Sequence, residues 1–428
     1  MSDFIRDYLT FLNTKIPTEN KVYQEFKVKF PTGDVEKWEN NLSSIKKFAI
    51  YYNKLLNPEK EQDQEIRLQI EYINRLEVKV AYPFLMKVYD DYSSKVIQKD
   101  VFLNILELVQ SFVWRRFIIG SQTGARNKIF MKLYDDVNKS DYLASIEKSL
   151  LRKKGNQKFP SNKEVINALK EKDVYGINTK NRIYFFERLE NFENKELVQI
   201  NNLTTEHIFP QNPDAKWKVD LNEEYSFIKE NYLNTIANLT LSGNNGSLSN
   251  KPFIQKRDMN TDGKEQGYKY SRLWLNRYLS TVDKWGKAEI EERFTLIKER
   301  FLKVWKFPSV EINESVPDEV NIFYADDPTK KKLEYVIFLD QKLKMTKVSE
   351  LYTEVMKTLF DLQPEPFFNT ELLGKLNLTQ DKNKLRRALA LNETYFIEST
   401  FNNKKKFEQI KTVLTIFNIE DELIIKFK

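Results

Sequence analysis

A single histidine, His207, lies in the stretch LTTEHIFPQNPDAKW, and no other histidine occurs among the 428 residues. An imidazole has an ordinary pKa of about 6.5, so it exchanges a proton near neutral pH and suits a general base. Glu206 precedes it and would point to the opposite side of an extended backbone, where it could bind a metal ion or a metal-bound water. The pair predicts a centre that activates water.

Asparagines follow this pair in the segment NTIANLTLSGNNGSLSNKPFIQKR. We expect Asn238 to hydrogen-bond the loop of His207 and to fix its ring, because an amide both donates and accepts. Asn244, Asn245 and Asn250 offer neutral amide oxygens as metal ligands near the start of the next helix. The residues alone leave the choice among these three open.

Three basic side chains, Lys251, Lys256 and Arg257, complete the constellation. They lie where they could contact the scissile or flanking phosphates of a nucleic acid. Hydrolysis of a phosphodiester needs an activated water, a cation that neutralises developing charge, and groups that hold the backbone, and this stretch has candidates for each. The alternative is structural: Glu206 and His207 would form a loop ion pair or a cap, and the asparagines would serve turns.

The composition limits the kind of metal site. The chain has no cysteine and one histidine, which excludes disulfides, thiol catalysis, cysteine-ligated zinc and an all-histidine site. A metal would be held mainly by oxygen, which favours magnesium, manganese or calcium. The net charge of +7, from 69 Lys and Arg against 62 Asp and Glu, permits a polyanionic partner without requiring one.

The sequence contains no signal-peptide pattern and no apolar run of about 20 residues. We therefore expect a soluble, cytoplasmic protein without a membrane partner. With 41% hydrophobic residues in 428, the chain should fold as two to three compact units.

The first part of the chain is predicted to be helical. Apolar residues recur at helical spacing through residues 1–155, and residues 101–113 are apolar enough for a buried central helix. Arg115 and Arg116 follow directly and permit two interpretations, a phosphate contact or structural pairing with Asp and Glu. Residues 120–124 should form a break before a helix at 127–137.

The central stretch is expected to interrupt this helical pattern. Residues 153–162 should form a hinge before two more helices, at 163–170 and 182–191. Residues 203–213 should not be helical, and 237–241 should form a short strand or turn. From residue 249 an amphipathic helical pattern continues to Pro308.

The acidic run 309–320 is predicted to be a linker to a small α+β unit. Its expected strands are 333–339, 395–399 and 422–427, and its expected helices are 348–362 and 385–391. The unit carries three basic clusters, Lys330 to Lys332, Arg386 with Arg387, and Lys404 to Lys406. A solvated surface explains each cluster as well as DNA binding does, and their convergence on one face would decide.

A longer pattern joins the central residues. Its members are Glu206-His207-Ile208-Phe209-Pro210-Gln211, Trp217, Ala237-Asn238-Leu239-Thr240-Leu241, Asn245, Leu248-Ser249-Asn250, Phe253 and Lys256. This pattern resembles the C-terminal, HNH-like half of the GmrSD-type, modification-dependent restriction endonucleases, a variant of the His-Me finger (ββα-metal) nucleases. Residues 5–9, 82–83, 114–117 and 285–305 look like the helical framework of the same family, so the resemblance covers residues 1–308.

The resemblance implies roles for individual residues. It makes His207 the general base, Asn238 the middle Asn of the HNH pattern, and Asn245 or Asn250 the metal-side Asn that replaces a final His. Ala237 departs from the usual Gly, and the loop from residue 238 to 253 is shorter than is typical. The Asp-Gly-Gln-Gln-Arg motif of the family's nucleotide-handling domain is absent here, so we expect that half to be a separate chain or to have been removed.

The expected architecture is mainly α, with a helical framework domain at 1–160 and an inserted ββα-metal (HNH-like) nuclease domain at 161–308. A linker at 309–320 and an accessory α+β domain at 321–428, a candidate for nucleic-acid binding, follow. The expected function is a DNA endonuclease, or its nuclease subunit, that uses Mg²⁺ or Mn²⁺ and cleaves foreign or modified DNA in anti-phage defence. The alternatives are a DNA-binding or modification-sensing module with a degenerate centre, and an RNA-directed nuclease.

Overall fold

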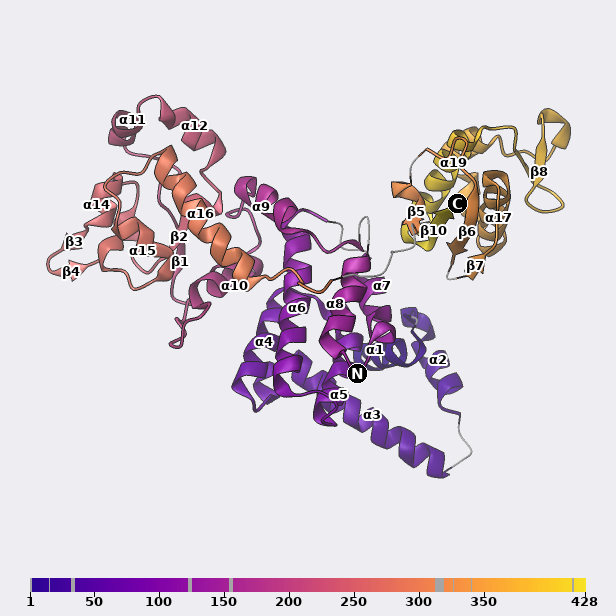
Figure 1. The fold of residues 1–428 in the computed structure, drawn as a ribbon, viewed down its shortest axis with the longest axis horizontal. Coiled ribbons are helices and arrows are strands. Elements are labelled where there is room, and N and C mark those ends of the chain that lie inside the picture. The colour runs from indigo at the N-terminus through magenta and orange to yellow at the C-terminus, as the bar shows by residue number, and fades with distance from the viewer. Residues whose placement is uncertain are drawn as a thin grey trace. The chain divides into compact units, whose positions relative to one another are not determined.

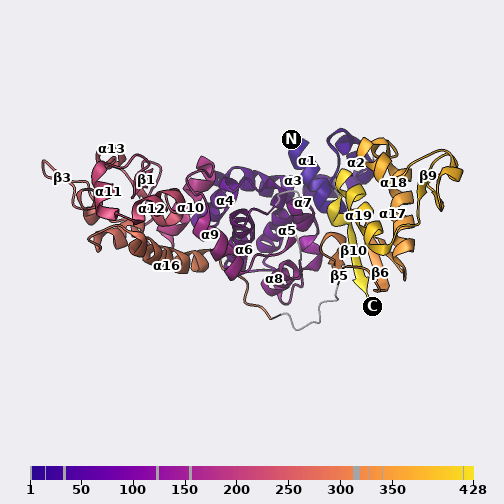
Figure 2. The same cartoon turned by 90° about the horizontal axis from the view of Figure 1, so that it is seen from above.

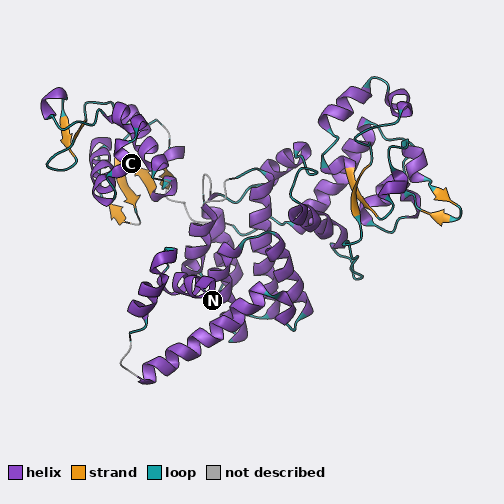
Figure 3. Cartoon of the chain, turned by 180° about the vertical axis from the view of Figure 1, so that it is seen from behind, coloured by secondary structure: helices purple, strands orange, loops and turns teal. Residues whose placement is uncertain are grey.

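The computed structural model describes residues 2–14, 16–31, 35–121, 125–153, 157–311, 319–325, 327–339, 341–417 and 419–428. The chain divides into two compact units, which we call unit 1 (1–151 and 158–310) and unit 2 (152–157 and 311–428). Helices predominate and strands are few and short (Figure 1, Figure 3). Most of the predicted linker, and parts of the predicted break and hinge, lie outside the described residues.

The first part of unit 1 is helical, which confirms the prediction for this region. Its helices are α1 Ser2–Asn13, α2 Val22–Lys29, α3 Val35–Leu56, α4 Gln64–Arg75, α5 Tyr82–Ser93, α6 Lys99–Ile118, α7 Ala125–Lys132 and α8 Tyr142–Arg152. In the described part of the chain, no helix is both long and apolar enough to span a membrane.

Helix α4 shows how the sequence specifies these helices. The Asp63 side chain accepts hydrogen bonds from the backbone N–H groups of Glu65 and Ile66, so two donors at the open end of the helix are satisfied. Ile66, Ile70 and Ile73 recur at helical spacing and are fully buried. The cap fixes where α4 begins, and the apolar stripe fixes the face that packs against α6.

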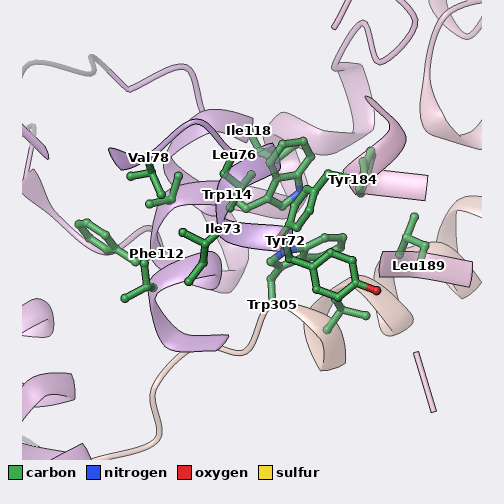
Figure 4. Packing of buried hydrophobic residues seen from close by; sticks show 14 of the residues in the cluster. Tyr72, Ile73, Leu76, Val78, Phe112, Trp114, Ile118, Tyr184, Leu189 and Trp305 are labelled. Carbon is green, nitrogen blue, oxygen red and sulfur yellow. Dashed lines mark hydrogen bonds between the residues drawn. The ribbon is translucent and has the colours of Figure 1, made fainter. Parts of the chain in front are cut away.

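Aromatic side chains from distant segments form the centre of the unit 1 core. Trp114 of α6 packs against both Tyr184 and Trp305, with ring centroids 5.1 and 5.9 Å away (Figure 4). The Nε1 group of Trp305 donates to the Tyr184 hydroxyl at 2.8 Å. Because one hydrophobic cluster includes residues from Phe4 to Trp305, the helical region and the central stretch share a core.

Arg115 is buried, and its partners match neither of the two interpretations offered by the sequence. Its guanidinium donates to the Trp305 carbonyl at 2.6 and 2.8 Å, to the Pro160 carbonyl at 3.1 Å and to Asn162 Oδ1 at 2.7 Å. Burial lowers the pKa of Arg115 to about 10. The side chain therefore has a structural role, but it binds carbonyl groups where the sequence suggested carboxylates.

The second part of unit 1 contains short strands among helices. In chain order its elements are α9 Asn162–Glu171, α10 Thr179–Asn191, β1 Thr204–His207, α11 Ala215–Leu221, α12 Glu224–Asn231, β2 Leu239–Ser242, α13 Asn245–Leu248, α14 Phe253–Arg257, β3 Asn260–Thr261, β4 Lys264–Glu265, α15 Trp274–Arg277 and α16 Lys287–Val304. The predicted helices at 163–170 and 182–191 correspond to α9 and α10.

The helical pattern expected from residue 249 to Pro308 is interrupted in the structure. Between α14 and α15 the chain forms the β3–β4 hairpin. Gly267 follows this hairpin and packs so close to the backbone of Arg257 that a Cβ atom would clash. The apolar positions form one pattern in sequence, but this close approach of two backbone segments breaks the helix.

Helix α16 reaches the segment between β1 and β2 through a buried arginine. Arg293 donates to the carbonyl groups of Ile236 and Ala237 at 2.9 and 2.7 Å. It also donates to the carbonyls of Leu239 and Leu275 at 2.9 and 3.1 Å. The guanidinium thus fixes the turn that enters β2.

Unit 2 contains a small antiparallel sheet with the strand order β5-β10-β6-β7. Helices α17 and α19 lie beside β6 and β10 (Figure 2). The elements of this unit are β5 Glu319–Asn321, β6 Leu333–Phe338, β7 Gln341–Leu343, α17 Val348–Leu362, α18 Thr370–Leu376, β8 Ala388–Ala390, β9 Phe396–Glu398, α19 Asn403–Ile416 and β10 Leu423–Phe427.

Two predictions for unit 2 are wrong. The segment 385–391, expected to be a helix, contains β8, which pairs with β9. The Glu398 carboxylate accepts hydrogen bonds from the backbone N–H groups of Arg386 and Arg387 at 2.8 and 3.2 Å. These two N–H groups are then not available for the hydrogen bonds of a helix. Residues 319–320, assigned to the linker, belong to β5.

Candidate active site

Strands β1 and β2 bring the two ends of the central stretch together. They pair antiparallel, with Glu206 opposite Thr240 and His207 opposite Leu239. Because successive side chains of a strand point to opposite faces, Glu206 and His207 project in opposite directions. Helices α13 and α14 follow β2 in the chain, and α13 lies against β1.

Asn238 holds the turn that follows His207. Its Nδ2 group donates to the carbonyls of Phe209 and Leu233, both at 2.9 Å, and its Oδ1 atom accepts from the Phe209 N–H at 2.8 Å. Trp285 Nε1 donates to the same Oδ1 atom at 3.1 Å. With both polar atoms of its side chain hydrogen-bonded and no exposed surface, Asn238 fixes the loop, whereas the imidazole is hydrogen-bonded by Asn234.

The His207 ring is held by residues far away in sequence. Its Nε2 atom lies 3.1 Å from Asn234 Oδ1, and its ring lies 4.5 Å from that of Tyr175. Asn234 Nδ2 is 3.5 Å from Asp173 Oδ2, and the Asn234 carbonyl accepts the backbone N–H groups of Val174 and Tyr175. The segment from Asp173 to Tyr175 and Asn234 therefore fix the orientation of the imidazole.

These contacts select one tautomer of the imidazole. Since Asn234 directs its Nδ2 group to a carboxylate, its Oδ1 atom faces His207, and Nε2 of the ring must carry the hydrogen. The lone pair then lies on Nδ1. Burial lowers the pKa of His207 below its ordinary value, and the Asn234 hydrogen bond opposes this shift. At neutral pH the ring is uncharged and able to accept a proton.

Glu206 and Lys256 form a buried ion pair on the other face of β1. Lys256 Nζ lies 2.6 Å from Glu206 Oε1 and also donates to the His207 carbonyl at 2.8 Å. The Tyr268 hydroxyl donates to the same Oε1 atom at 3.3 Å. Burial raises the pKa of Glu206 and lowers that of Lys256, and the attraction between the two charges opposes both shifts.

Lys256, which the sequence suggested as a phosphate contact, has an exposed fraction of 0%. Its ammonium group is occupied by Glu206 and the backbone of His207, so it has no surface left for a phosphate. A lysine near the end of a short amphipathic helix looks solvent-exposed in sequence, whereas the fold turns it inward. Its position makes it a support for β1.

The three later asparagines differ in their surroundings. Asn245 Nδ2 donates to the Thr205 carbonyl at 3.0 Å, and Asn244 Nδ2 donates to the Gln266 carbonyl at 3.3 Å. The Asn250 side chain is exposed, while its carbonyl accepts the Asp214 N–H at 3.3 Å. Asn245 is thus the one whose side chain is tied to β1, the strand that carries Glu206 and His207.

The remaining predicted phosphate contacts also differ. Arg257 is paired with Asp258 at 2.7 Å and with Asp283, so its charge is compensated by two carboxylates. Lys251 is half-buried and donates to the Ser247 carbonyl at 2.6 Å. The positive charge of Lys251 is therefore less compensated than that of Arg257, which makes Lys251 the better candidate for binding an external anion.

The predicted metal ligands are oxygen donors, the type that a hard divalent cation prefers. Among the described residues, no group of three or more His, Cys, Asp and Glu could form a metal site. Both hydrogen bonds to the Glu206 carboxylate fall on Oε1, which leaves Oε2 as an oxygen donor, and the asparagines add amide oxygens. Mg²⁺ commonly takes one or two carboxylates and fills its remaining positions with water and phosphate.

Sequence reasoning did not find Asn234, Asp173 or Tyr175. Asn234 lies 27 residues from His207, and no motif connects them. The segment NTIAN contains two asparagines in front of β2, Asn234 and Asn238, and this repetition is the signal in the sequence that points to Asn234. Asp173 and Tyr175 had no comparable signal, because the loop they occupy reaches the site only through folding.

Residues 159–299 match the family model for the GmrSD restriction endonucleases, C-terminal domain. This segment includes β1, β2 and the residues that surround His207. A search of curated proteins finds no match.

Proposed function

Since residues 159–299 belong with the C-terminal domain of GmrSD restriction endonucleases, we propose that the chain is a divalent-metal-dependent DNA endonuclease, or its nuclease subunit. Its role would be the cleavage of foreign or modified DNA in defence against phage. The observation that carries this proposal is the uncharged His207, whose Nε2 is held by Asn234 so that Nδ1 is left to accept a proton.

In the proposed mechanism His207 acts on water. Nδ1 takes a proton from the water molecule that attacks phosphorus, and the bond from phosphorus to the leaving oxygen breaks. Asn234 keeps the ring in the tautomer that has its lone pair on Nδ1, and Asn238 holds the turn after His207 in place. Lys251 is the candidate for an adjacent phosphate.

The metal would be held by an amide oxygen of Asn245 or Asn250 with water and phosphate in its other positions, and Mg²⁺ and Mn²⁺ both suit such ligands. Glu206, the predicted carboxylate ligand, keeps Oε2 as a donor only on the face of β1 opposite to His207, where it is buried. When bound, a divalent cation supplies positive charge that stabilises the phosphate and its leaving oxygen. Lys256 binds the other carboxylate oxygen and the His207 carbonyl, so it holds Glu206 and His207 in fixed register. This is why we assign Lys256 a supporting role.

Plasmid cleavage tests the proposal directly. The wild-type chain should nick or linearise plasmid DNA in the presence of Mg²⁺ or Mn²⁺. Addition of EDTA should stop this cleavage. Binding that persists without cleavage under every metal condition would favour a DNA-binding or modification-sensing module with an inactive centre. Digestion restricted to RNA would favour the RNA-directed alternative. Parallel digestion of modified and unmodified phage DNA then tests the dependence on modification.

A further inference from the structure

Three basic clusters of unit 2, far apart in sequence, come together around the start of α19. Lys404 and Lys405 lie in the first turn of this helix and are exposed. Arg386 and Arg387 precede β8, and the residues from Lys330 to Lys332 precede β6. The convergence of clusters separated by some 70 residues is a property of the fold, because nothing in the sequence requires it.

Contacts of the backbone and of side chains connect the second cluster to α19. The Arg387 carbonyl accepts the backbone N–H of Ser399 at 3.0 Å, only a few residues before the helix begins. Lys406, in the same first turn, lies 5.9 Å above the Tyr352 ring, and the Tyr352 hydroxyl donates to the Glu398 carbonyl at 3.3 Å. Burial lowers the pKa of Lys406, and the charge of Arg387 lowers it further.

Aromatic side chains connect the first cluster to α19. Lys331 Nζ lies 5.0 Å above the Phe427 ring, and that ring stacks on Phe407 of α19 at 6.4 Å. The Lys332 carbonyl accepts the backbone N–H of the C-terminal residue at 2.9 Å. The three clusters thus border one surface, which we call the α19 basic surface: Lys330, Lys331, Lys332, Arg386, Arg387, Lys404 and Lys405.

Among the described residues, few carboxylates lie beside the charges of Arg386, Arg387, Lys404 and Lys405. Asp327 lies near it: its pKa is lowered mainly by hydrogen bonds from Thr329 and less by the charges of Lys404 and Lys331. Lys405 pairs with Glu408 at 3.4 Å. Across the described residues, no carboxylate lies within ion-pair distance of the charged groups of Arg386, Arg387 or Lys404. The buried Glu398 carboxylate is nearby, but it accepts the backbone N–H groups of Arg386 and Arg387 at 2.8 and 3.2 Å.

The position of the lysines on α19 is unfavourable for the helix itself. The first turn of α19 contains no acidic residue, although the positive end of the helix dipole favours negative charge there. Lysines at this end repel the helix dipole and one another. A polyanion that binds across the surface would remove both repulsions, whereas water and salt only screen them.

We propose that the α19 basic surface binds the phosphate backbone of double-stranded DNA. The surface favours a duplex over a single strand because single-strand binders stack bases on exposed aromatic rings. Here the aromatic rings are covered, since Phe407 is buried and Phe427 lies beneath Lys331. Contacts would be made to phosphates alone, so binding should be independent of sequence and sensitive to salt.

A pair of matched double variants of the full chain tests this proposal. Arg387→Ala with Lys404→Ala removes two charges from the α19 basic surface, while Lys344→Ala with Lys357→Ala removes two exposed charges of unit 2 that do not belong to this set of residues. Affinity for a labelled duplex is measured by anisotropy over a series of salt concentrations. EDTA is present throughout, so that cleavage plays no part and the result does not depend on the nuclease proposal.

The first double variant should bind the duplex about tenfold more weakly, with a salt slope shallower by about 2, because each lost phosphate contact removes ~0.9 from it. The control should match the wild type, and Arg387→Lys with Lys404→Arg should retain binding, which separates charge from folding. Equal losses in both double variants, or no loss in the first, would overturn the proposal. So would a surface-dependent preference for single-stranded DNA or RNA over the duplex.

Discussion

The surroundings of His207 and the α19 basic surface use the same kind of side chain in opposite ways. In the first, the ammonium group of Lys256 is buried, pairs with Glu206 and donates a hydrogen bond to a backbone carbonyl. In the second, Arg386, Arg387 and Lys404 are exposed, and no carboxylate of the described residues lies within ion-pair distance of their charged groups. Burial and partners, and not residue type, therefore decide whether a lysine supports the fold or meets a ligand.

The largest expected effect is on catalysis at the first of these regions. His207→Ala should reduce cleavage by about 10²–10⁴-fold, since this is the usual contribution of a general base. DNA binding in EDTA and the unfolding midpoint should stay near those of the wild type. Retained cleavage would eliminate the mechanism because the chain has no second histidine. Unfolding of the variant would support the structural role for Glu206 and His207.

The next effect compares a buried lysine with an exposed one. Lys256→Met leaves Glu206 buried without its partner and should destabilise unit 1 by ~3–5 kcal/mol, whereas Lys404→Met should stay within ~0.5 kcal/mol. The six tryptophans all belong to unit 1, so their fluorescence reports its denaturation, and the far-UV circular dichroism of the full chain also follows the denaturation of unit 2, which contains Lys404. Adding Glu206→Gln to Lys256→Met should restore part of the stability. Equal effects of both lysine substitutions would contradict the comparison.

Asn234 should act on His207 by position and not by contact with DNA. Asn234→Ala should lower cleavage by roughly 10–100-fold, a typical effect of a residue that orients a functional group. Asn234→Asp, which keeps an acceptor for Nε2, should retain more activity. A merely structural role would change the unfolding midpoint and leave the pH profile of cleavage as it is, whereas the tautomer role should shift that profile.

The pH dependence follows from the direction of the His207 shift. Because its pKa in the folded chain is lower than 6.5, the ring stays uncharged down to a more acidic pH than free imidazole does. Cleavage should therefore hold at pH 6.5 and fall only below it. In the unfolded chain the pKa of His207 is higher, so the unfolded chain binds a proton at this histidine more readily. The free energy of unfolding should therefore also decrease as pH falls below 6.5. An acid limb of the rate profile above pH 6.5 would exclude His207 as the base.

The smallest effect separates the candidate metal ligands. If Asn245 provides the amide oxygen, Asn245→Ala should raise the Mg²⁺ concentration needed for half-maximal cleavage, and Asn250→Ala should not. The opposite result would assign the role to Asn250. Identical metal requirements in both variants and the wild type would show that neither side chain binds the cation.

Local patterns predicted the elements better than they predicted the site. The helix over residues 348–362 was found because its apolar residues keep a helical period within one segment, and α17 has the same bounds. The site depends on contacts such as that of Asn234 with His207, and on the burial of Lys256, which arise only when distant segments fold together. The segment 385–391 was mispredicted for a similar reason, since the Glu398 carboxylate that orders it comes from the next strand.

Arg293 of α16 holds the turn into β2 through contacts that neither acid nor salt readily removes. Arg293 binds four carbonyl groups around the turn into β2, and none of those partners carries a charge that acid can remove. Dissolved ions also compete poorly for a guanidinium enclosed in the core. The hydrogen bonds that hold the turn into β2 should therefore change little with the salt concentration of the solution. When DNA affinity is measured against salt concentration, the changes should come from charges on the surface, while the turn into β2 keeps its shape.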